Sequence, residues 1–156
     1  MVPTKAALVE QVVRLVDIRL LDPLEILLAG DAALDTVRGL IGTRAEDWAE
    51  LMLDGEDGVA VGTIVRLVAS LYPSDGPFEP PVEWWSTPIG QVLALRVGHP
   101  TAQAVSYPVA GAMLGITRQG VYDLIARGKL ARHPDGGVLP ASIRDRLRGE
   151  GRDNRG

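Results

Sequence analysis

The sequence contains no cysteine and only two histidines, His99 and His133. A chain without cysteine forms no disulfide, offers no thiolate nucleophile and cannot build a cysteine-based zinc site. Each histidine lies beside a proline in an expected loop, so a histidine-based centre would need two distant loops to converge. We therefore predict that the protein binds no metal and no cofactor.

Long apolar runs are equally scarce. Arg14, Asp17 and Arg19 interrupt the apolar N-terminal segment, which also lacks the basic region that opens a signal peptide. No other stretch approaches the roughly 20 apolar residues needed to cross a bilayer. Because 46% of the 156 residues are hydrophobic, enough to bury a core, the composition predicts a soluble, cytoplasmic protein that does not enter membranes.

Patterns typical of catalysis are missing as well. The acidic pairs Glu46-Asp47 and Glu56-Asp57 fall at an expected helix start and in a turn, where capping and solvation account for them. The spaced glycines between 111 and 120 follow no expected strand of the kind that precedes a phosphate-binding loop. We predict that the protein is not an enzyme.

Helix signals occupy the first 72 residues. Four helix starts are expected at residues whose side chains cap a helix N-terminus: Thr4, Asp22, Asp31 and Thr43. Gly30 and Gly42 should end the second and third helices. The apolar run from 59 to 72 has β-branched residues that suit a strand, but its length and spacing favour a helix. We predict an acidic helical domain over residues 1–72 whose broad apolar stripes mediate self-association or partner binding.

A proline-rich segment follows, and it has no room for a helix. Residues 73–83 therefore predict a semi-rigid, extended connector. Trp84 and Trp85 come next and could pack in the core, anchor the connector or form a partner surface. Thr87 and Pro88 then start a linking helix within residues 84–99.

Charge is divided unevenly along the chain, whose net charge is −4. From residue 100 onward, nine Lys and Arg stand against five Asp and Glu, a balance of +4. The first 99 residues hold seven basic and fifteen acidic side chains, a balance of −8. A basic module in an acidic chain is the charge pattern expected where one segment contacts nucleic-acid phosphates.

The basic segment contains two short helices joined by a tight turn. Ser106 should cap the first helix and Gly115 should end it, while Thr117 should cap the second. We expect Ile116, in the turn, to lie in the core. Two helices joined in this way form a helix-turn-helix.

The second helix, from about Arg118 to Arg127, has one apolar and one polar face. Its apolar face carries Val121, Leu124 and Ile125. Its polar face shows Arg118, Gln119, Tyr122 and Asp123 near the start. This is how a recognition helix presents side chains to a DNA major groove.

Turn residues and a last helix complete this segment. Asp135, Gly136 and Gly137 suit the turn of a small β-hairpin wing. A helix should begin near Pro140 and direct Arg144 and Arg148 outward, and residues 149–156 should form a flexible tail.

Several short motifs in this segment appear in order and at matching spacing. They are Leu114-Gly115, Ile116-Thr117-Arg118-Gln119, Val121-Tyr122 and Gly128-Lys129-Leu130. On these motifs, residues 105–148 resemble the small winged helix-turn-helix of the excisionase and MerR families. The chain departs from the usual pattern at Val109-Ala110-Gly111, where the families have Glu-Ala-Ala, and at Gly120, where they have Ser or Thr. Neither departure removes a basic group.

The resemblance implies a site for double-stranded DNA. Its residues would be Thr117, Arg118, Gln119, Gly120, Tyr122, Arg127, Lys129 and Arg132. Arg118 could read guanine and Gln119 adenine, while Gly120 allows close approach. Tyr122 could contact phosphate or pack on the first helix, and the remaining cations suit phosphate contacts that carry no sequence information.

We therefore predict an all-α protein: an N-terminal helical bundle followed by a C-terminal winged helix-turn-helix, residues 100–148, with a small β-hairpin wing. Its function would be sequence-specific DNA binding, as a transcriptional regulator or an excisionase-like architectural factor. One such module buries little DNA surface, so we expect a homo-oligomer, such as a homodimer, formed through the N-terminal domain. The alternative is an antitoxin-like or recombinase-associated adaptor whose helix-turn-helix binds a protein.

Overall fold

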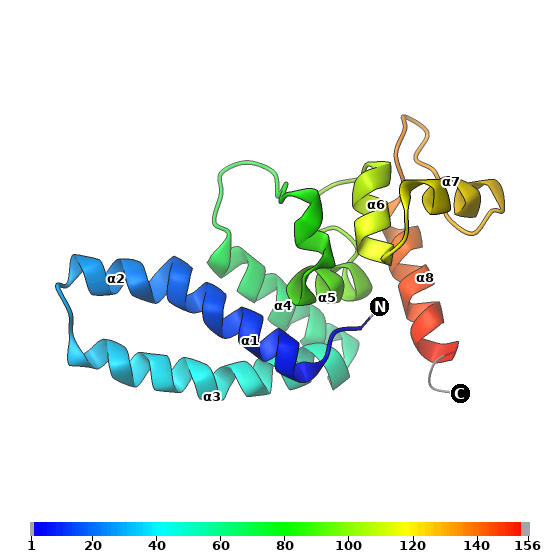
Figure 1. The fold of residues 1–156 in the computed structure, drawn as a ribbon. Coiled ribbons are helices and arrows are strands. Elements are labelled where there is room, and N and C mark those ends of the chain that lie inside the picture. Colours follow the sequence, from blue (N-terminus) through cyan, green and yellow to red (C-terminus); the bar gives the residue numbers. More distant parts are fainter. Residues whose placement is uncertain (1, 154–156) are drawn as a thin grey trace. The chain divides into compact units, whose positions relative to one another are not determined.

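The computed structural model describes residues 2–153, and the described part of the chain is helical, with no strand (Figure 1). The predicted all-α class is confirmed. The helices form two compact units, one from Thr4 to Pro73 and the other made chiefly of the chain from Ser74 onward. Among the described helices, none has both the length and the apolar character that crossing a bilayer requires.

The N-terminal unit contains α1 (Lys5–Val16), a π-helical turn η1 (Asp17–Leu21), α2 (Asp22–Leu27), α3 (Ala32–Asp54) and α4 (Asp57–Leu71). The first three form one continuous rod that doubles back as α3 (Figure 1). Thr4 and Asp31 cap α1 and α3 through their side-chain oxygens, as predicted. The ambiguous run near residue 60 forms α4, a helix. The core combines side chains from three helices: Leu8, Val12 and Val16 of α1, Ala45, Ala49 and Met52 of α3, and Ile64 and Leu71 of α4.

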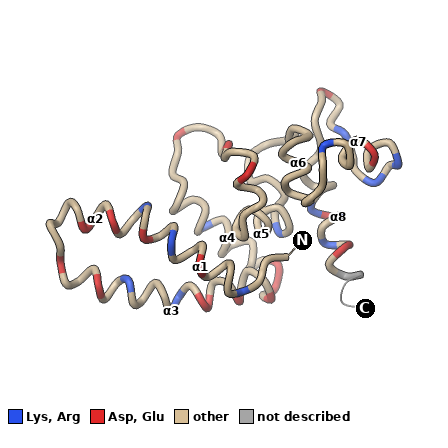
Figure 2. The backbone as a smooth tube through the Cα atoms, in the orientation of Figure 1, with Lys and Arg blue, Asp and Glu red and all other residues tan. Residues whose placement is uncertain are grey.

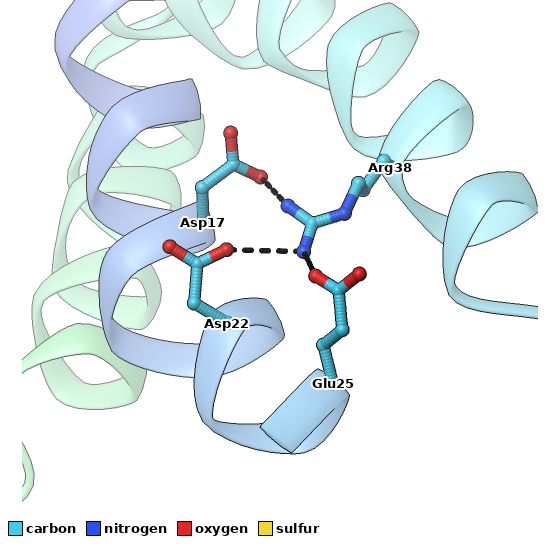
Figure 3. A network of polar contacts seen from close by, with 4 residues as sticks. All are labelled: Asp17, Asp22, Glu25 and Arg38. Carbon is cyan, nitrogen blue, oxygen red and sulfur yellow. Dashed lines mark hydrogen bonds and ion pairs between the residues drawn. The ribbon is translucent and has the colours of Figure 1, made fainter. Parts of the chain in front are cut away.

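The prediction that Asp22 caps a separate helix is wrong. Asp22 has helical backbone angles, and its N–H donates to Asp17 O across the wide π-helical turn. Its carboxylate instead accepts a hydrogen bond of 3.0 Å from Arg38 of α3, which also binds Asp17 at 2.9 Å and Glu25 at 2.8 Å (Figure 3). The hydrogen bond to Asp22 is the main cause of a raised pKa for Arg38. One guanidinium therefore holds three carboxylates of the rod against α3.

The predicted break between Gly42 and Thr43 is also wrong, because α3 is one helix of 23 residues. Thr43 Oγ1 donates to the carbonyl of Gly39, one turn earlier, and so does not cap a new helix. Ala45 and Ala49 are fully buried against the rest of the unit. Their packing overrides the helix-ending tendency of glycine, which is worth only about 1 kcal/mol.

The C-terminal unit contains the 3₁₀ turn η2 (Val82–Ser86), α5 (Pro88–Arg96), α6 (Tyr107–Leu114), α7 (Arg118–Ala126) and α8 (Pro140–Asp153). Helix α8 packs on α5 and α6, and α6 packs on α7 and η2. Ile143 and Leu147 of α8 are buried, as the sequence predicts. Helix α8 extends to Asp153, into the predicted flexible tail of residues 149–156, and residues 154–156 lie outside the described part of the chain.

The two tryptophans lie in the core of this unit. Trp84 and Trp85 are 8% and 1% exposed, and their rings meet edge to face at 5.0 Å. Phe78, within the proline-rich segment, packs edge-on against both rings. His99 lies 5.4 Å from the Trp85 ring and accepts backbone N–H bonds from Thr101 and Ala102 at Nδ1. Burial lowers the pKa of His99, although Glu79 and the backbone of Phe78 oppose the shift.

Arg148 does not point outward as predicted. Its guanidinium donates to the carbonyls of Leu95, at 3.1 Å, and Arg96, at 2.8 Å. These carbonyls belong to the last turn of α5, which has no further helical N–H to accept. Arg148 therefore joins the end of α5 to α8 and is half-buried.

Candidate nucleic-acid interface

The helix-turn-helix forms from local capping signals. Ser106 Oγ accepts the N–H of Val109, and Gly115 ends α6 with a φ of 71° that favours glycine. Thr117 Oγ1 then accepts the N–H of Gly120 at 3.0 Å and starts α7. The bounds of both helices therefore follow from residues that the sequence marks.

Gly111 sets how closely the turn approaches the first helix. A Cβ atom at Gly111 would lie 2.8 Å from the carbonyl oxygen of Ile116, a distance that real Cβ atoms do not reach. A Cβ at Gly120 would instead meet the Ile116 side chain at 3.4 Å, where a small shift suffices. The contact explains why Gly111 stands where the excisionase and MerR pattern has Ala, but it does not explain Val109 in place of Glu. Gly120 lies where a larger residue would fit with little strain.

The turn residue Ile116 is not in the core as predicted, since 38% of its surface is exposed. Val121 of α7 is fully buried and occupies the space against α6. Leu124 and Ile125 are half-buried on the same helix. The tight approach at Gly111 leaves Ile116 on the outside of the turn.

The predicted site residues lie on one short stretch of the chain. Thr117, Arg118 and Gln119 are exposed at the start of α7, and Arg127, Lys129 and Arg132 are exposed at its end and in the following loop. Figure 2 shows basic positions around α7 and in the following loop. Within the described residues, none of these four cations forms a salt bridge (Arg118, Arg127, Lys129 and Arg132). Their charge is therefore directed to solvent.

Three contacts order the polar face of α7. Tyr122 stacks on Tyr107 of α6 with ring centres 4.6 Å apart, and the Arg118 guanidinium lies 5.9 Å from the Tyr122 ring centre. Gln119 Nε2 donates to Asp123 one turn later, at 3.2 Å. Of the two predicted readings of Tyr122, packing on the first helix is thus present. Its ring also stays 41% exposed, so contact with a ligand remains open to it.

The predicted β-hairpin wing is not formed by strands in the described residues. Between α7 and α8, the chain makes single antiparallel bridges, Arg132 with Val138 and Val138 with Val105. Pro134 has no N–H to donate to a ladder. Gly136 and Gly137 have φ values of 107° and 83°, so they belong to the turn, and most residues between Arg132 and Val138 are turn residues. Too few residues remain on either side for a ladder. We call residues 128–139 the α7–α8 loop.

A shallow open groove of about 630 Å³ lies beside this loop. Lys129 lines its loop side, and Asp145, Arg146 and Glu150 line its α8 side. Arg146 is paired with Glu150 at 3.3 Å. The groove therefore offers mixed, partly neutralised charge and no strong site for an anion.

The remaining classes of site find no support in the described residues, which contain no cluster of three metal-ligating side chains. Comparisons with protein-family models, with curated proteins and with solved structures find no match to this chain. The case for a function therefore rests on the geometry of the chain itself.

Sequence reasoning missed Tyr107, which supports Tyr122, and Arg148, which binds the end of α5. The sequence did contain a signal for Tyr107: one aromatic residue begins α6 and another lies on α7, and two such residues on adjacent short helices can pack together. For Arg148 there was none, since its partners are backbone carbonyls 52 and 53 residues away.

Proposed function

We propose that the protein binds double-stranded DNA through α7 and the α7–α8 loop, with sequence selectivity, as a regulator or architectural factor of the excisionase and MerR type. The observation that carries this proposal is the exposed start of α7, where Arg118 and Gln119 face solvent. Helix α6 supports this start, because Gly111 lets α6 lie close to the turn before α7. Recognition helices of this kind contact base edges with their first residues. No described acidic residue forms a salt bridge with Arg118.

Phosphate contacts would come from the cations that follow. Arg127, Lys129 and Arg132 are exposed at the end of α7 and in the α7–α8 loop, where their charges are accessible to phosphates. Each phosphate that a cation neutralises releases a counterion, so affinity falls as salt rises. With only a few such cations, one protomer should bind nonspecific DNA weakly.

The N-terminal unit supports pairing of protomers. Large apolar side chains are exposed on η1, on α2 and the residue after it, and on the first half of α3: Leu20, Leu24, Ile26, Leu27, Leu28, Val37 and Leu40. Ile26 and Leu27 are 81% and 78% exposed, well beyond what folding of the monomer would favour. We propose that this surface joins protomers, so that two recognition helices act on one site.

The same apolar surface favours a second candidate, an adaptor that binds a protein through it and uses the helix-turn-helix for protein contact. Asp123, exposed on α7, would suit a basic partner better than a phosphate. If the protein is such an adaptor, neither the wild-type chain nor the Arg118→Ala variant should bind DNA selectively.

Binding-site selection from random duplexes with the full chain, followed by fluorescence anisotropy on the selected duplex, tests the proposal. Arg118→Ala should weaken selective binding about tenfold or more, in line with the loss of one bidentate base contact. Arg44→Ala, which removes the same charge from an exposed site on α3, is the matched control and should change little. No selected sequence, or selective binding that survives both Arg118→Ala and Gln119→Ala, would refute the assignment of α7.

Sedimentation of the full chain tests pairing. We expect a dimer that Leu27→Glu converts to monomer, whereas Val59→Glu, at an exposed apolar position of α4, leaves the dimer intact. A monomeric wild-type chain at high concentration would exclude this part of the proposal.

A further inference from the structure

Three side chains form a stack at the start of the recognition helix. Tyr107 opens α6, Tyr122 lies on α7 with its ring centre 4.6 Å from that of Tyr107 and tilted by 40° to it, and the Arg118 guanidinium lies over the Tyr122 ring, 5.9 Å from its centre. Tyr107 is half-buried, whereas Tyr122 and Arg118 are both exposed. The stack therefore runs from the body of the helix-turn-helix to the exposed guanidinium.

This arrangement bears on how Arg118 would meet a base. A free arginine side chain has about 2 kcal/mol of rotamer entropy, part of which is lost when it binds in one geometry. A guanidinium resting on an aromatic face is restricted beforehand, while its N–H groups, which lie at the edge of the plane, stay available. Within the described residues, no acceptor takes a hydrogen bond from Arg118, so both edges stay open to a ligand.

Gln119 is arranged in the opposite way. To read adenine, an amide must offer both its oxygen and its nitrogen to one base. In this chain the nitrogen already donates to Asp123, and a carboxylate beside the amide would also face the negative groove. Reading adenine through Gln119 therefore requires breaking a contact that reading guanine through Arg118 does not.

We infer that Tyr107 is a positioning residue for base recognition: through Tyr122 it holds Arg118 ready, and the base read at the start of α7 is guanine. The inference rests on the proposed DNA binding and names the base and the support that the proposal leaves open. Tyr107 itself touches no base.

A purely structural role for Tyr107 predicts a different result. If its ring only stabilised the α6–α7 pair, its removal would lower folding stability and reduce all DNA binding by one factor. A positioning role predicts a loss confined to the guanine-containing site, with nonspecific affinity and its salt dependence unchanged.

The test uses the full chain and its selected duplex, with each guanine in turn replaced by 7-deazaguanine, which lacks the N7 acceptor. For wild type, one such replacement should weaken binding about tenfold. Tyr107→Phe keeps the ring and should keep this penalty. Tyr107→Ala should reduce the penalty to about twofold while leaving affinity for a random duplex unchanged. An unchanged penalty in Tyr107→Ala, or a site defined by adenine that depends on Gln119, would overturn the inference.

A second measurement needs no DNA. In the free protein, the ring of Tyr122 should shift the NMR resonance of the Arg118 Nε–H upfield, in wild type and Tyr107→Phe alike. Tyr107→Ala should move it back, and if that variant folds poorly, Tyr107→Leu fills the space without an aromatic face. A resonance that stays in place in the alanine or leucine variant overturns the positioning role. If wild type selects no DNA sequence, the proposed function and the base assignment both fail, and this measurement alone then decides whether the stack exists.

Discussion

Arg38 of the N-terminal unit and Arg118 of the C-terminal unit differ in whether their donors are satisfied. In the N-terminal unit, Arg38 is bound by three carboxylates (Figure 3). Arg19 of the same unit lies over the Tyr72 ring, 4.2 Å from its centre, and donates to Leu71 O. In the C-terminal unit, Arg118 rests on an aromatic ring and meets no carboxylate among the described residues. An arginine with satisfied donors stabilises its own fold, whereas one with unused donors can bind a ligand. The net charge of a unit therefore says less about its partners than the contacts of each cation.

The two units should unfold in separate transitions, and a substitution at a glycine of one unit should lower only the stability of that unit. A Cβ atom at Gly90, the third residue of α5, would lie 2.2 Å from Trp84 O and 2.7 Å from Trp85 Cα, both backbone atoms. Gly90→Ala should therefore cost about 3 kcal/mol, the upper part of the range for overpacking. Urea unfolding followed by circular dichroism should show two transitions, with only the one for the C-terminal unit lowered. A transition that Gly90→Ala leaves unchanged would mean that η2 and α5 can move apart to admit the methyl group at little cost in stability.

Removing Arg38 should produce the next largest change, in the other unit. Arg38→Gln leaves Asp17, Asp22 and Glu25 close together without their cation, so the N-terminal unit should unfold at lower urea. Since all four side chains are partly exposed, added salt should screen the remaining repulsion and narrow the difference from wild type. Arg66→Gln, an exposed position on α4, is the control. Equal midpoints for Arg38→Gln and wild type at low salt would show that the network contributes nothing.

Gly42→Ala should stabilise the N-terminal unit. Gly42 lies inside α3, and a Cβ atom there would meet nothing within 4 Å. Alanine reduces the freedom of the unfolded chain and should add about 0.5–1 kcal/mol to the free energy of unfolding. The same substitution type at Gly90 destabilises, so the pair contrasts open and closed glycine sites in one chain. A loss of stability at Gly42 would indicate a contact that the open surroundings do not show.

The smallest effect should come from pH. The folded-state pKa of His99 lies below its ordinary value of 6.5, mainly because of burial, so the unfolded chain binds the proton more readily. Stability from this group is present above pH 6.5 and is lost as pH falls from 6.5 toward the lower, folded pKa. Protonation at Nδ1 would also break the bonds from Thr101 and Ala102. Thermal melts between pH 7 and 5 should show a decline for the C-terminal unit, partly removed in His99→Gln. Identical pH profiles for the two proteins would count against this assignment.

Much of the helix-turn-helix could be predicted, because its signals are local. Ser106, Gly115 and Thr117 act on backbone groups within four residues, and no distant contact competes with them. The same kind of signal failed at Asp22 and Thr43, where Arg38 takes the carboxylate and packing continues the helix. A capping residue therefore predicts a helix start only where its side chain has no better partner.

For the candidate site, the sequence could predict which side chains are exposed but not the contacts that they make. The exposed cations of α7 and the α7–α8 loop follow from helical periodicity, which marks the polar face. The stack of Tyr107 and Tyr122, the single bridges in place of a hairpin and the binding of Arg148 to α5 depend on the approach of segments far apart in sequence. No local pattern encodes those distances, so the sequence overstated the wing and placed Arg148 on the surface.

The π-helical turn at residues 17–21 makes the length of the first rod matter more than its composition. The turn contains more residues than an α-helical turn, so Asp22 donates to a carbonyl five residues back. A turn of this kind takes up one extra residue, so the helix on either side of it keeps its faces. Deleting one residue from the regular helix before the turn would instead rotate all that follows by about 100°, and Asp22 and Glu25 would then leave Arg38. Single-residue insertions and deletions in the regular part of the rod should therefore break the contacts with Arg38, whereas substitutions at exposed positions that make no such contact, such as Ile18, should be tolerated.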